Sequence, residues 1–238
     1  MNNCLIAELS NCFLIIIQLM NNSVSMNKYM QLKKGLIYLI SAISFNFSFS
    51  QEELFTAKVL TEPGLFTSGI EGPACDKDGN IYAVNFQTQG TIGKTTPDGD
   101  CSLFVELPEG STGNGIRFNS NGEMLIADYT KHNILKVDMD TKEISVFAHE
   151  PKMNQPNDIA ITSTDILFAS DPNWKDSTGN IWRIDKDGKV ALLESGMGTT
   201  NGVEVSPGDK ILYVNESIQR NIWAYDLSPE ETSAIKNY

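Results

Sequence analysis

A four-residue motif recurs through this chain at nearly constant spacing, and this repeat restricts the possible folds more than any other feature. Each copy begins with Glu or Asn, continues with Gly or Asp, and leads into a strand-like run. Successive copies start 43, 43 and 44 residues apart. A period in the low forties with about four short strands per unit is typical of β-propeller blades, which pack around a central channel. The copies are Glu71-Gly72-Pro73-Ala74, Asn114-Gly115-Ile116-Arg117, Asn157-Asp158-Ile159-Ala160 and Asn201-Gly202-Val203-Glu204.

Short strand-like runs fill the intervals between these copies. They are rich in β-branched and aromatic residues, and Gly, Asp, Asn and Pro separate them, without a long stretch of helical periodicity. Segments such as residues 76–80 and 119–123 precede these runs. They are predicted to be tight turns, because Asp and Gly tolerate positive φ and Asp bonds to nearby backbone amides. These Asp and Gly residues do not match a calcium loop of the EF-hand type, because such a loop needs its Gly two residues later and a Glu at its twelfth position. We therefore predict an all-β fold whose Asp-Gly turns are hairpins.

The N-terminal segment has a composition of its own. Lys28, Lys33 and Lys34 precede the apolar residues 36–43, and this order predicts a secretory signal peptide. A retained N-terminal anchor is the alternative, although the apolar part is short for a membrane span and Ser and Asn interrupt it. We therefore expect residues 1–50 to be a leader and the protein to be exported, either periplasmic or secreted.

A second apolar run, residues 13–20, lies before this signal. Translation begins either at Met26 or Met30, or at Met1 with a longer leader. In each case residues 51–238 remain for the fold, and this length suits one domain with a sizeable core.

The acidic composition narrows the class of partner. The chain has 18 Lys and Arg against 30 Asp and Glu, a net charge of −12. Such a surface repels nucleic acid and anionic lipid, so we expect no nucleic-acid partner and no membrane contact apart from the leader. It suits cations and neutral ligands, or it serves only to keep the protein in solution.

Two cysteines, Cys75 and Cys101, follow the leader. They form either a disulfide in an oxidising compartment or two buried free thiols, and we favour the thiols because the spacing gives no sign of pairing. The composition leaves the oligomeric state open.

The repeated motif also predicts a site. If it enters the innermost strand of each blade, Glu71, Asn114, Asn157 and Asn201 meet at the channel mouth. One carboxylate with several amide oxygens can bind a hard divalent cation, with calcium favoured and zinc, magnesium or manganese as alternatives. Asn-Gly and Asn-Asp pairs are also ordinary turn formers, so a repeated turn without a site is the other interpretation. Glu71 followed by Gly-Pro is no copy of that turn, and it favours the cation site.

Several of these pieces occur in the order seen in a known family. They are Glu-Gly-Pro at Glu71, Pro-Asn-Asp at Asn157, Ser-Asp-Pro at Asp171, and Asn-Gly-Val at Asn201 before Ser-Pro-Gly-Asp-Lys-Ile-Leu-Tyr-Val. Over roughly residues 64–230 the chain resembles gluconolactonases, regucalcin (senescence marker protein) and luciferin-regenerating-enzyme-like proteins. The resemblance implies a six-bladed β-propeller with a catalytic metal in its channel and the hydrolysis of sugar lactones.

The resemblance also implies residue roles. Glu71, Asn157 and Asn201 match metal ligands of the family, and the residue matching Asn157 contacts metal or substrate depending on the member. Asn114 matches a channel-lining Asn and implies a substrate contact. Asp171 matches an Asp near the site, with either a substrate-binding or a structural turn role.

One family feature has no counterpart in this sequence. Another interval of 43 or 44 residues runs past Tyr238, where relatives carry an Asp that completes the metal shell and serves as general base. We therefore assign no catalytic residue and expect a six-bladed type of propeller truncated at its C-terminal side to about four blades. A truncated gene product, a piece of a longer protein and a divergent four-bladed ring are the three interpretations, and we favour the first two.

The expected chemistry is metal-dependent lactone hydrolysis, impaired in this chain. A bound metal would polarise the lactone carbonyl while water attacks it. The sequence contains neither a Gly-x-Ser-x-Gly elbow nor a His-Glu-x-x-His zinc motif. Its two histidines, His132 and His149, lie outside the motif positions, and we expect them on the surface or within strands. The alternative is a non-catalytic propeller that binds a ligand or a protein partner.

Overall fold

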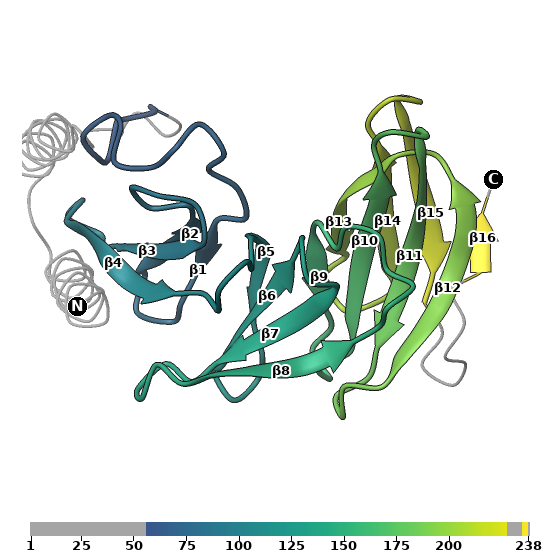
Figure 1. The fold of residues 1–238 in the computed structure, drawn as a ribbon. Helices are drawn as coiled ribbons and strands as arrows, with labels where there is room; N and C mark the ends of the chain where they lie inside the picture. Colours follow the sequence, from purple (N-terminus) through teal and green to yellow (C-terminus); the bar gives the residue numbers. More distant parts are fainter. Residues whose placement is uncertain (1–55, 228–234, 238) are drawn as a thin grey trace, which may run out of the picture. The chain divides into compact units, whose positions relative to one another are not determined.

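The structure is a computed structural model that describes residues 56–227 and 235–237 (Figure 1). The expected leader, residues 1–50, lies outside the described residues. The described residues from Lys58 onward belong to one compact unit. In the part of the chain that the structure describes, no helix has the length and apolar character that crossing a membrane requires.

Within the described residues, sixteen strands form four antiparallel sheets, each made of four strands that follow one another in the chain. The strands are β1 Ala74–Cys75, β2 Ile81–Val84, β3 Thr91–Thr95, β4 Cys101–Glu106, β5 Gly113–Phe118, β6 Met124–Asp128, β7 Asn133–Val137, β8 Ile144–His149, β9 Ile159–Ile161, β10 Leu167–Asn173, β11 Thr178–Ile184, β12 Val190–Met197, β13 Thr200–Val205, β14 Ile211–Glu216, β15 Asn221–Asp226 and β16 Ile235–Asn237. The first strands of successive sheets contact one another, β1 with β5, β5 with β9 and β9 with β13. This is the arrangement of propeller blades. The all-β and propeller predictions are therefore confirmed, with four blades in the described residues.

Hairpins join the first two strands of each sheet, as predicted for the turns at residues 76–80 and 119–123. In the first sheet, Asp76 Oδ1 accepts hydrogen bonds from the backbone N–H groups of Asp78 and Asn80, both at 2.9 Å. The fourth turn residue has a positive φ in every sheet, where Gly, and less readily Asp, is tolerated. These residues are Gly79, Gly122, Asp165 and Asp209, with φ of 84°, 80°, 63° and 56°.

Two of these turns also bind the preceding sheet. Asp165 Oδ1 accepts a hydrogen bond from the Ser120 backbone N–H at 2.8 Å, and its other oxygen accepts from the Ser120 hydroxyl. Asp209 Oδ2 accepts from both the N–H and the hydroxyl of Ser163. In the fourth sheet, Pro207 stands at the position of Ser120 and Ser163. Pro has no N–H, so it cannot donate the backbone hydrogen bond that these two Ser residues donate. Each link therefore connects one sheet to the next along the chain.

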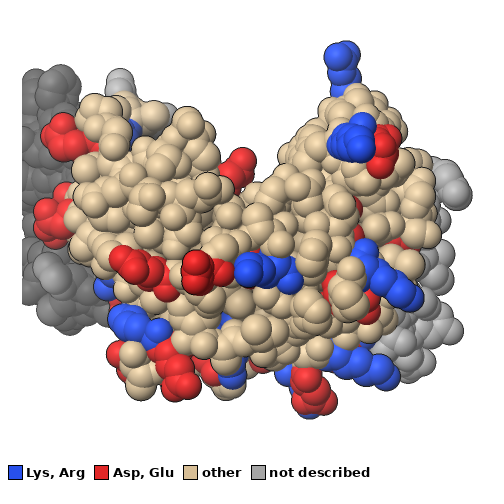
Figure 2. Space-filling view, in the orientation of Figure 1, with Lys and Arg blue, Asp and Glu red and all other residues tan. Residues whose placement is uncertain are grey.

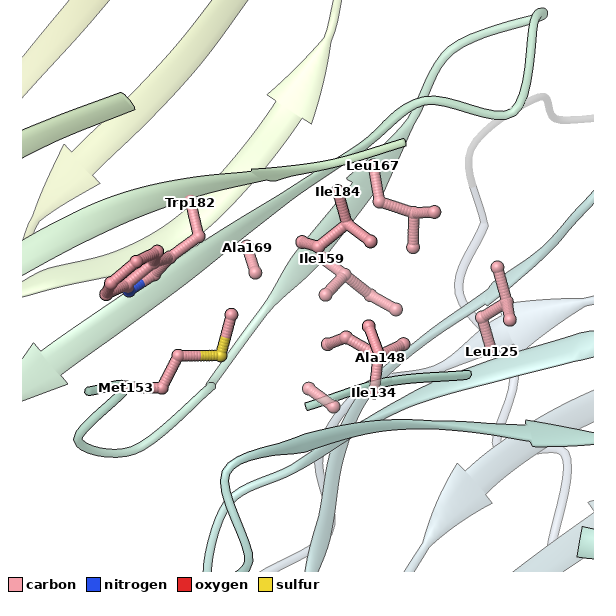
Figure 3. Packing of buried hydrophobic residues seen from close by; sticks show 10 residues of the cluster. Leu125, Ile134, Ala148, Met153, Ile159, Leu167, Ala169, Trp182 and Ile184 are labelled. Carbon is pink, nitrogen blue, oxygen red and sulfur yellow. The ribbon is translucent and has the colours of Figure 1, made fainter. Parts of the chain in front are cut away.

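Apolar side chains form a layer between each pair of neighbouring sheets. In the layer shown in Figure 3, Leu125 and Ile134 of the second sheet belong to one buried cluster with Ile159, Leu167 and Trp182 of the third. Similar clusters join the first sheet to the second and the third to the fourth. Full burial of one large apolar side chain contributes about 1.5–3 kcal/mol. Each sheet is therefore stabilised mainly by its neighbours.

The first strands approach so closely that two motif glycines leave no space for a side chain. A Cβ at Gly72 would lie 2.0 Å from the carbonyl oxygen of Asn114. A Cβ at Gly115 would lie 2.7 Å from Asp158 Oδ1. The Gly115 N–H also donates a hydrogen bond to the carbonyl of Asn157 at 2.8 Å. Packing between sheets therefore requires Gly at the second motif position in these two copies.

Charged side chains of both signs are interspersed on the face shown in Figure 2. Among the described residues, Lys136 Nζ lies 2.9 Å from Glu123 Oε1. Hydrogen bonds from Lys136 and Asn119 keep the pKa of Glu123 below its usual value.

The cysteine prediction is correct in bonding and wrong in burial. Cys75 and Cys101 are both free thiols, but Cys75 is exposed and Cys101 is half-buried. In the two-residue strand β1, Ala74 packs against the core while Cys75 points to the opposite face. Cys101 begins β4, which is the last strand of its sheet and pairs with β3 alone among the described strands.

We expect Gly72→Ala to lower the free energy of unfolding by about 3 kcal/mol, because its methyl group would collide with the Asn114 carbonyl. Gly122→Ala is the matched control. Its φ is also positive but no atom lies within 4 Å of the added Cβ, so backbone strain alone should cost about 1 kcal/mol. Urea unfolding of both variants measures the difference, and equal losses would contradict the close approach of the first two sheets.

Candidate functional site

The four first residues of the motif line one pocket of about 390 Å³. Glu71 lies just before β1, Asn114 in β5, Asn157 just before β9 and Asn201 in β13. Because these strands are the first of each sheet and contact one another, residues far apart in sequence share one wall. The other lining residues are Gly72, Pro73, Arg117, Asp158, Gly202 and Asn215.

Two of the Asn-Gly pairs lie in β-bulges. Asn114 and Gly115 together face the single residue Ala127, because the register shifts between the flanking pairs of β5 and β6. Asn201 and Gly202 lie in an equivalent bulge between β13 and β14. A bulge changes the direction in which a side chain points. For these two copies the interpretation as ordinary turns is wrong, since both pairs belong to strands.

The pocket carries polar atoms that are not used by the fold. Asn157 is only 7 % exposed, yet its side-chain amide makes no hydrogen bond to any described residue. The side chains of Glu71 and Asn114 likewise have no hydrogen-bond or ion-pair partner within residues 56–227. Asn201 Nδ2 donates to Ser217 Oγ at 2.9 Å, which leaves Asn201 Oδ1 available to a ligand.

Asp158 is a pocket residue whose role the sequence patterns did not indicate. Its Oδ1 accepts from the Ile159 N–H at 2.9 Å and its Oδ2 from the Val203 N–H at 3.0 Å. Arg117 Nη1 lies 3.6 Å from Asp158 Oδ1, and Arg117 Nη2 lies 3.2 Å from Glu204 Oε2. This group connects the second, third and fourth sheets beside the pocket.

Burial is the main influence on the Asp158 carboxyl, and it raises the pKa above the usual value. The Arg117 charge and the two backbone N–H groups act in the opposite direction. One signal in the repeat marked this position, because the third copy has Asp where the other three copies have Gly. A side chain fits there only because Gly115 of the preceding sheet leaves room for it.

Asp171 is not among the residues that line this pocket. It is fully buried, and its Oδ1 accepts from the backbone N–H groups of Asn154 and Gln155 at 2.7 and 2.6 Å. Its Oδ2 accepts from Asn180 Nδ2 and Trp182 Nε1 at 3.2 and 2.8 Å. These four donors give Asp171 the structural position that was one of its two expected roles.

Neither histidine lines this pocket. His149 lies at the end of β8, with its Nδ1 2.7 Å from Asn133 Oδ1, and His132 lies in the loop before β7. Among the described residues, no group of three or more His, Cys, Asp and Glu side chains could hold a metal ion. A metal in the pocket would therefore depend on amide oxygens and water in addition to Glu71.

Residues 70–237 match the model of the SMP-30/Gluconolactonase/LRE-like region. The chain belongs to this family. The resemblance seen in the ordered motifs is thereby confirmed, and the match includes all four pocket residues of the repeat.

Similar proteins are longer than this chain. A gluconolactonase of Zymomonas mobilis is 28 % identical over 199 residues, which are 71 % of this chain and 56 % of that protein. The structure of a Xanthomonas campestris gluconolactonase has a TM-score of 0.61 and 15 % identity, covering 71 % of this chain and 61 % of that one. For the calcium-binding protein regucalcin of Agrobacterium tumefaciens the values are 0.60, 21 %, 73 % and 58 %. These structures support the propeller fold, and the chain spans little more than half of the curated relative.

Removal of the Arg117 charge should destabilise the fold through Asp158. In Arg117→Met the half-buried Asp158 carboxylate keeps only backbone donors, and we expect a loss of about 2 kcal/mol in the free energy of unfolding. Glu204→Gln removes the second carboxylate that contacts Arg117. Because the Glu204 side chain is 65 % exposed, we expect a loss below about 1 kcal/mol. Urea titrations with a chelator present measure both variants, and the reverse order would show that Arg117 does not stabilise Asp158.

Proposed function

We propose that this protein is a metal-dependent hydrolase of sugar lactones of the gluconolactonase type. The observation that carries the proposal is the single pocket in which Glu71 and the three Asn of the repeat meet, in a chain that belongs to the gluconolactonase family. The Zymomonas mobilis relative supports the reaction class by its name.

The pocket chemistry fits a hard cation. Glu71 supplies one carboxylate, and Asn157 and Asn201 supply amide oxygens, which with water make an oxygen donor set of the kind calcium accepts. Asn157 supports this fit, because its amide lines the pocket and is not engaged by any described residue. Calcium is favoured since neither His nor Cys is among the described residues that line the pocket, with magnesium, manganese and zinc as alternatives.

Bound there, the cation would supply Lewis acidity that polarises a lactone carbonyl. Asn114, which is not part of the donor set, would bind hydroxyl oxygens of the sugar through its amide. Pro73 would form an apolar part of the wall. Asp158 would stay in place between Arg117 and its two backbone donors. Asp171 has no part in binding substrate in this proposal, because its carboxylate is already occupied by four donors.

The same pocket supports the expected impairment. Glu71 and Asp158 are its two carboxylates among the described residues. Glu71 would be committed to the cation, and Asp158 is committed to Arg117 and two N–H groups. With no unengaged base beside the carbonyl, activation of water is weak and turnover should be slow.

Calcium titration of the whole chain by calorimetry tests the proposal. We expect one site, and we expect Glu71→Gln and Asn201→Ala each to weaken binding at least about tenfold, because each removes a ligand. Glu204→Gln is the control, since it removes a carboxylate that does not line the pocket. Hydrolysis of gluconolactone should be slow and should stop when a chelator is added. Absence of calcium binding, or unchanged affinity in both ligand variants, would refute the metal site.

A non-catalytic propeller that binds a ligand or partner is the second candidate, and it is favoured because, with Glu71 committed to the cation, neither carboxylate among the described pocket residues is free to act as a base. The same experiments distinguish the two. Binding of calcium and lactone without any chelator-sensitive turnover would identify a binding protein, whereas measurable turnover identifies the enzyme.

We also infer that the protein is exported. The support is the order of Lys followed by apolar residues in the segment 28–43, which lies outside the described residues. N-terminal sequencing of protein recovered from the periplasm or the medium tests this, and recovery of uncleaved chain only from the cytoplasm would contradict it.

A further inference from the structure

Three of the four sheets carry a buried acid near the end of the second strand. Asp128 and Asp171 are 0 % exposed and Glu216 is 4 % exposed. They occupy equivalent positions in β6, β10 and β14. A buried carboxylate is costly unless hydrogen bonds compensate for its lost hydration, so each one needs a set of donors.

One oxygen of each acid binds the backbone that leads to the pocket Asn of the same sheet. In the second sheet, Asp128 Oδ1 accepts from the N–H of Thr112, two residues before Asn114, at 3.2 Å. In the fourth sheet, Glu216 Oε1 accepts from the N–H of Gly198, shortly before Asn201, at 2.6 Å.

The third sheet repeats this arrangement. Asp171 Oδ1 accepts from the N–H groups of Asn154 and Gln155 at 2.7 and 2.6 Å, and these residues precede Asn157. In all three sheets the bound backbone therefore lies within three residues of the Asn that lines the pocket.

The other oxygen of each acid is held by an Asn of the third strand that pairs with it across the sheet. The Nδ2 group of that Asn donates in each case. The contacts are Asn133 to Asp128 at 3.2 Å, Asn180 to Asp171 at 3.2 Å and Asn221 to Glu216 at 3.0 Å. The carboxylate is therefore fixed from the sheet side and can fix the loop in turn.

The acid also adjoins the bulge that directs the pocket residue. Gly113 pairs with Asp128 and Thr200 pairs with Glu216, and both pairs are the last regular ones before a bulge. The acid thus holds the backbone at the point where the strand changes direction.

The first sheet has an amide at this position. Asn85 is 6 % exposed, and its Nδ2 donates to the carbonyl of Gly69 at 2.6 Å, two residues before Glu71. The group that faces the loop is here a donor bound to a carbonyl, whereas in the other sheets it is an acceptor bound to N–H groups.

We propose that Asp128, Asp171 and Glu216 are positioning residues, each of which sets the direction of the pocket Asn in its own sheet. The effect on metal binding rests on the proposed function, but the effect on the loops does not. Glu216 should influence Asn201, a metal ligand in the proposed site, and Asp128 should influence Asn114, which is not a ligand.

Glu216→Gln and Asp128→Asn test this, because both replace a buried acid by its amide and remove one acceptor. We expect Glu216→Gln to weaken calcium binding about tenfold and Asp128→Asn to change it less than about twofold. Equal losses in both variants would overturn the assignment, since a purely structural role affects both alike. Asn221→Ala removes one hydrogen-bond donor to Glu216, and Asn221 is exposed. This variant should weaken calcium binding less than Glu216→Gln does, and it replaces that variant in the test if Glu216→Gln does not fold.

Amide hydrogen exchange tests the loops without any metal. We expect faster exchange confined to residues 198–201 in Glu216→Gln and to residues 111–114 in Asp128→Asn. Unchanged exchange in both segments, or an increase spread over all four sheets, would overturn the proposal. If the unmodified chain binds no calcium, the proposed function fails while this measurement still decides the role of the acids.

Discussion

The fold depends on how closely the first strands of neighbouring sheets approach one another. At Gly72 and Gly115 the next backbone occupies the place of a side chain, and the Gly115 N–H donates directly to Asn157 of the next sheet. This approach brings the residues before each glycine to a common wall. It also lets Asp158 reach backbone N–H groups of two sheets. The pocket is therefore a product of the packing between sheets rather than of any single loop.

The repeat alone was sufficient to predict the propeller and the residues that share the pocket, because a constant interval places equivalent residues at equivalent positions around one axis. The bulges at Asn114 and Asn201 were not predictable, since they depend on the register with the second strand. The network of Asp158 was also missed. Its partners Arg117 and Val203 lie in other sheets, and no local pattern connects them. The burial of the cysteines was overestimated because composition does not show which face of a strand a residue occupies.

Two kinds of acidic residue can be distinguished in this acidic chain. Glu71 has no partner among the described residues and faces the pocket, whereas Asp171 and Glu216 are buried and each accepts hydrogen bonds at both carboxylate oxygens. Both kinds are carboxylates near the pocket, so proximity alone does not distinguish them. The number and type of donors around each one separates a group available to a ligand from a group that supports the backbone.

The links from Ser120 to Asp165 and from Ser163 to Asp209 have a consequence for biogenesis. In each link the earlier sheet offers the donors and the later sheet brings the carboxylate. The partner of each new sheet is therefore the preceding sheet, which is synthesised first. The sheets can dock one after another in the order of the chain. Coupling through these turns reaches only adjacent blades, as expected for a linear array of repeats.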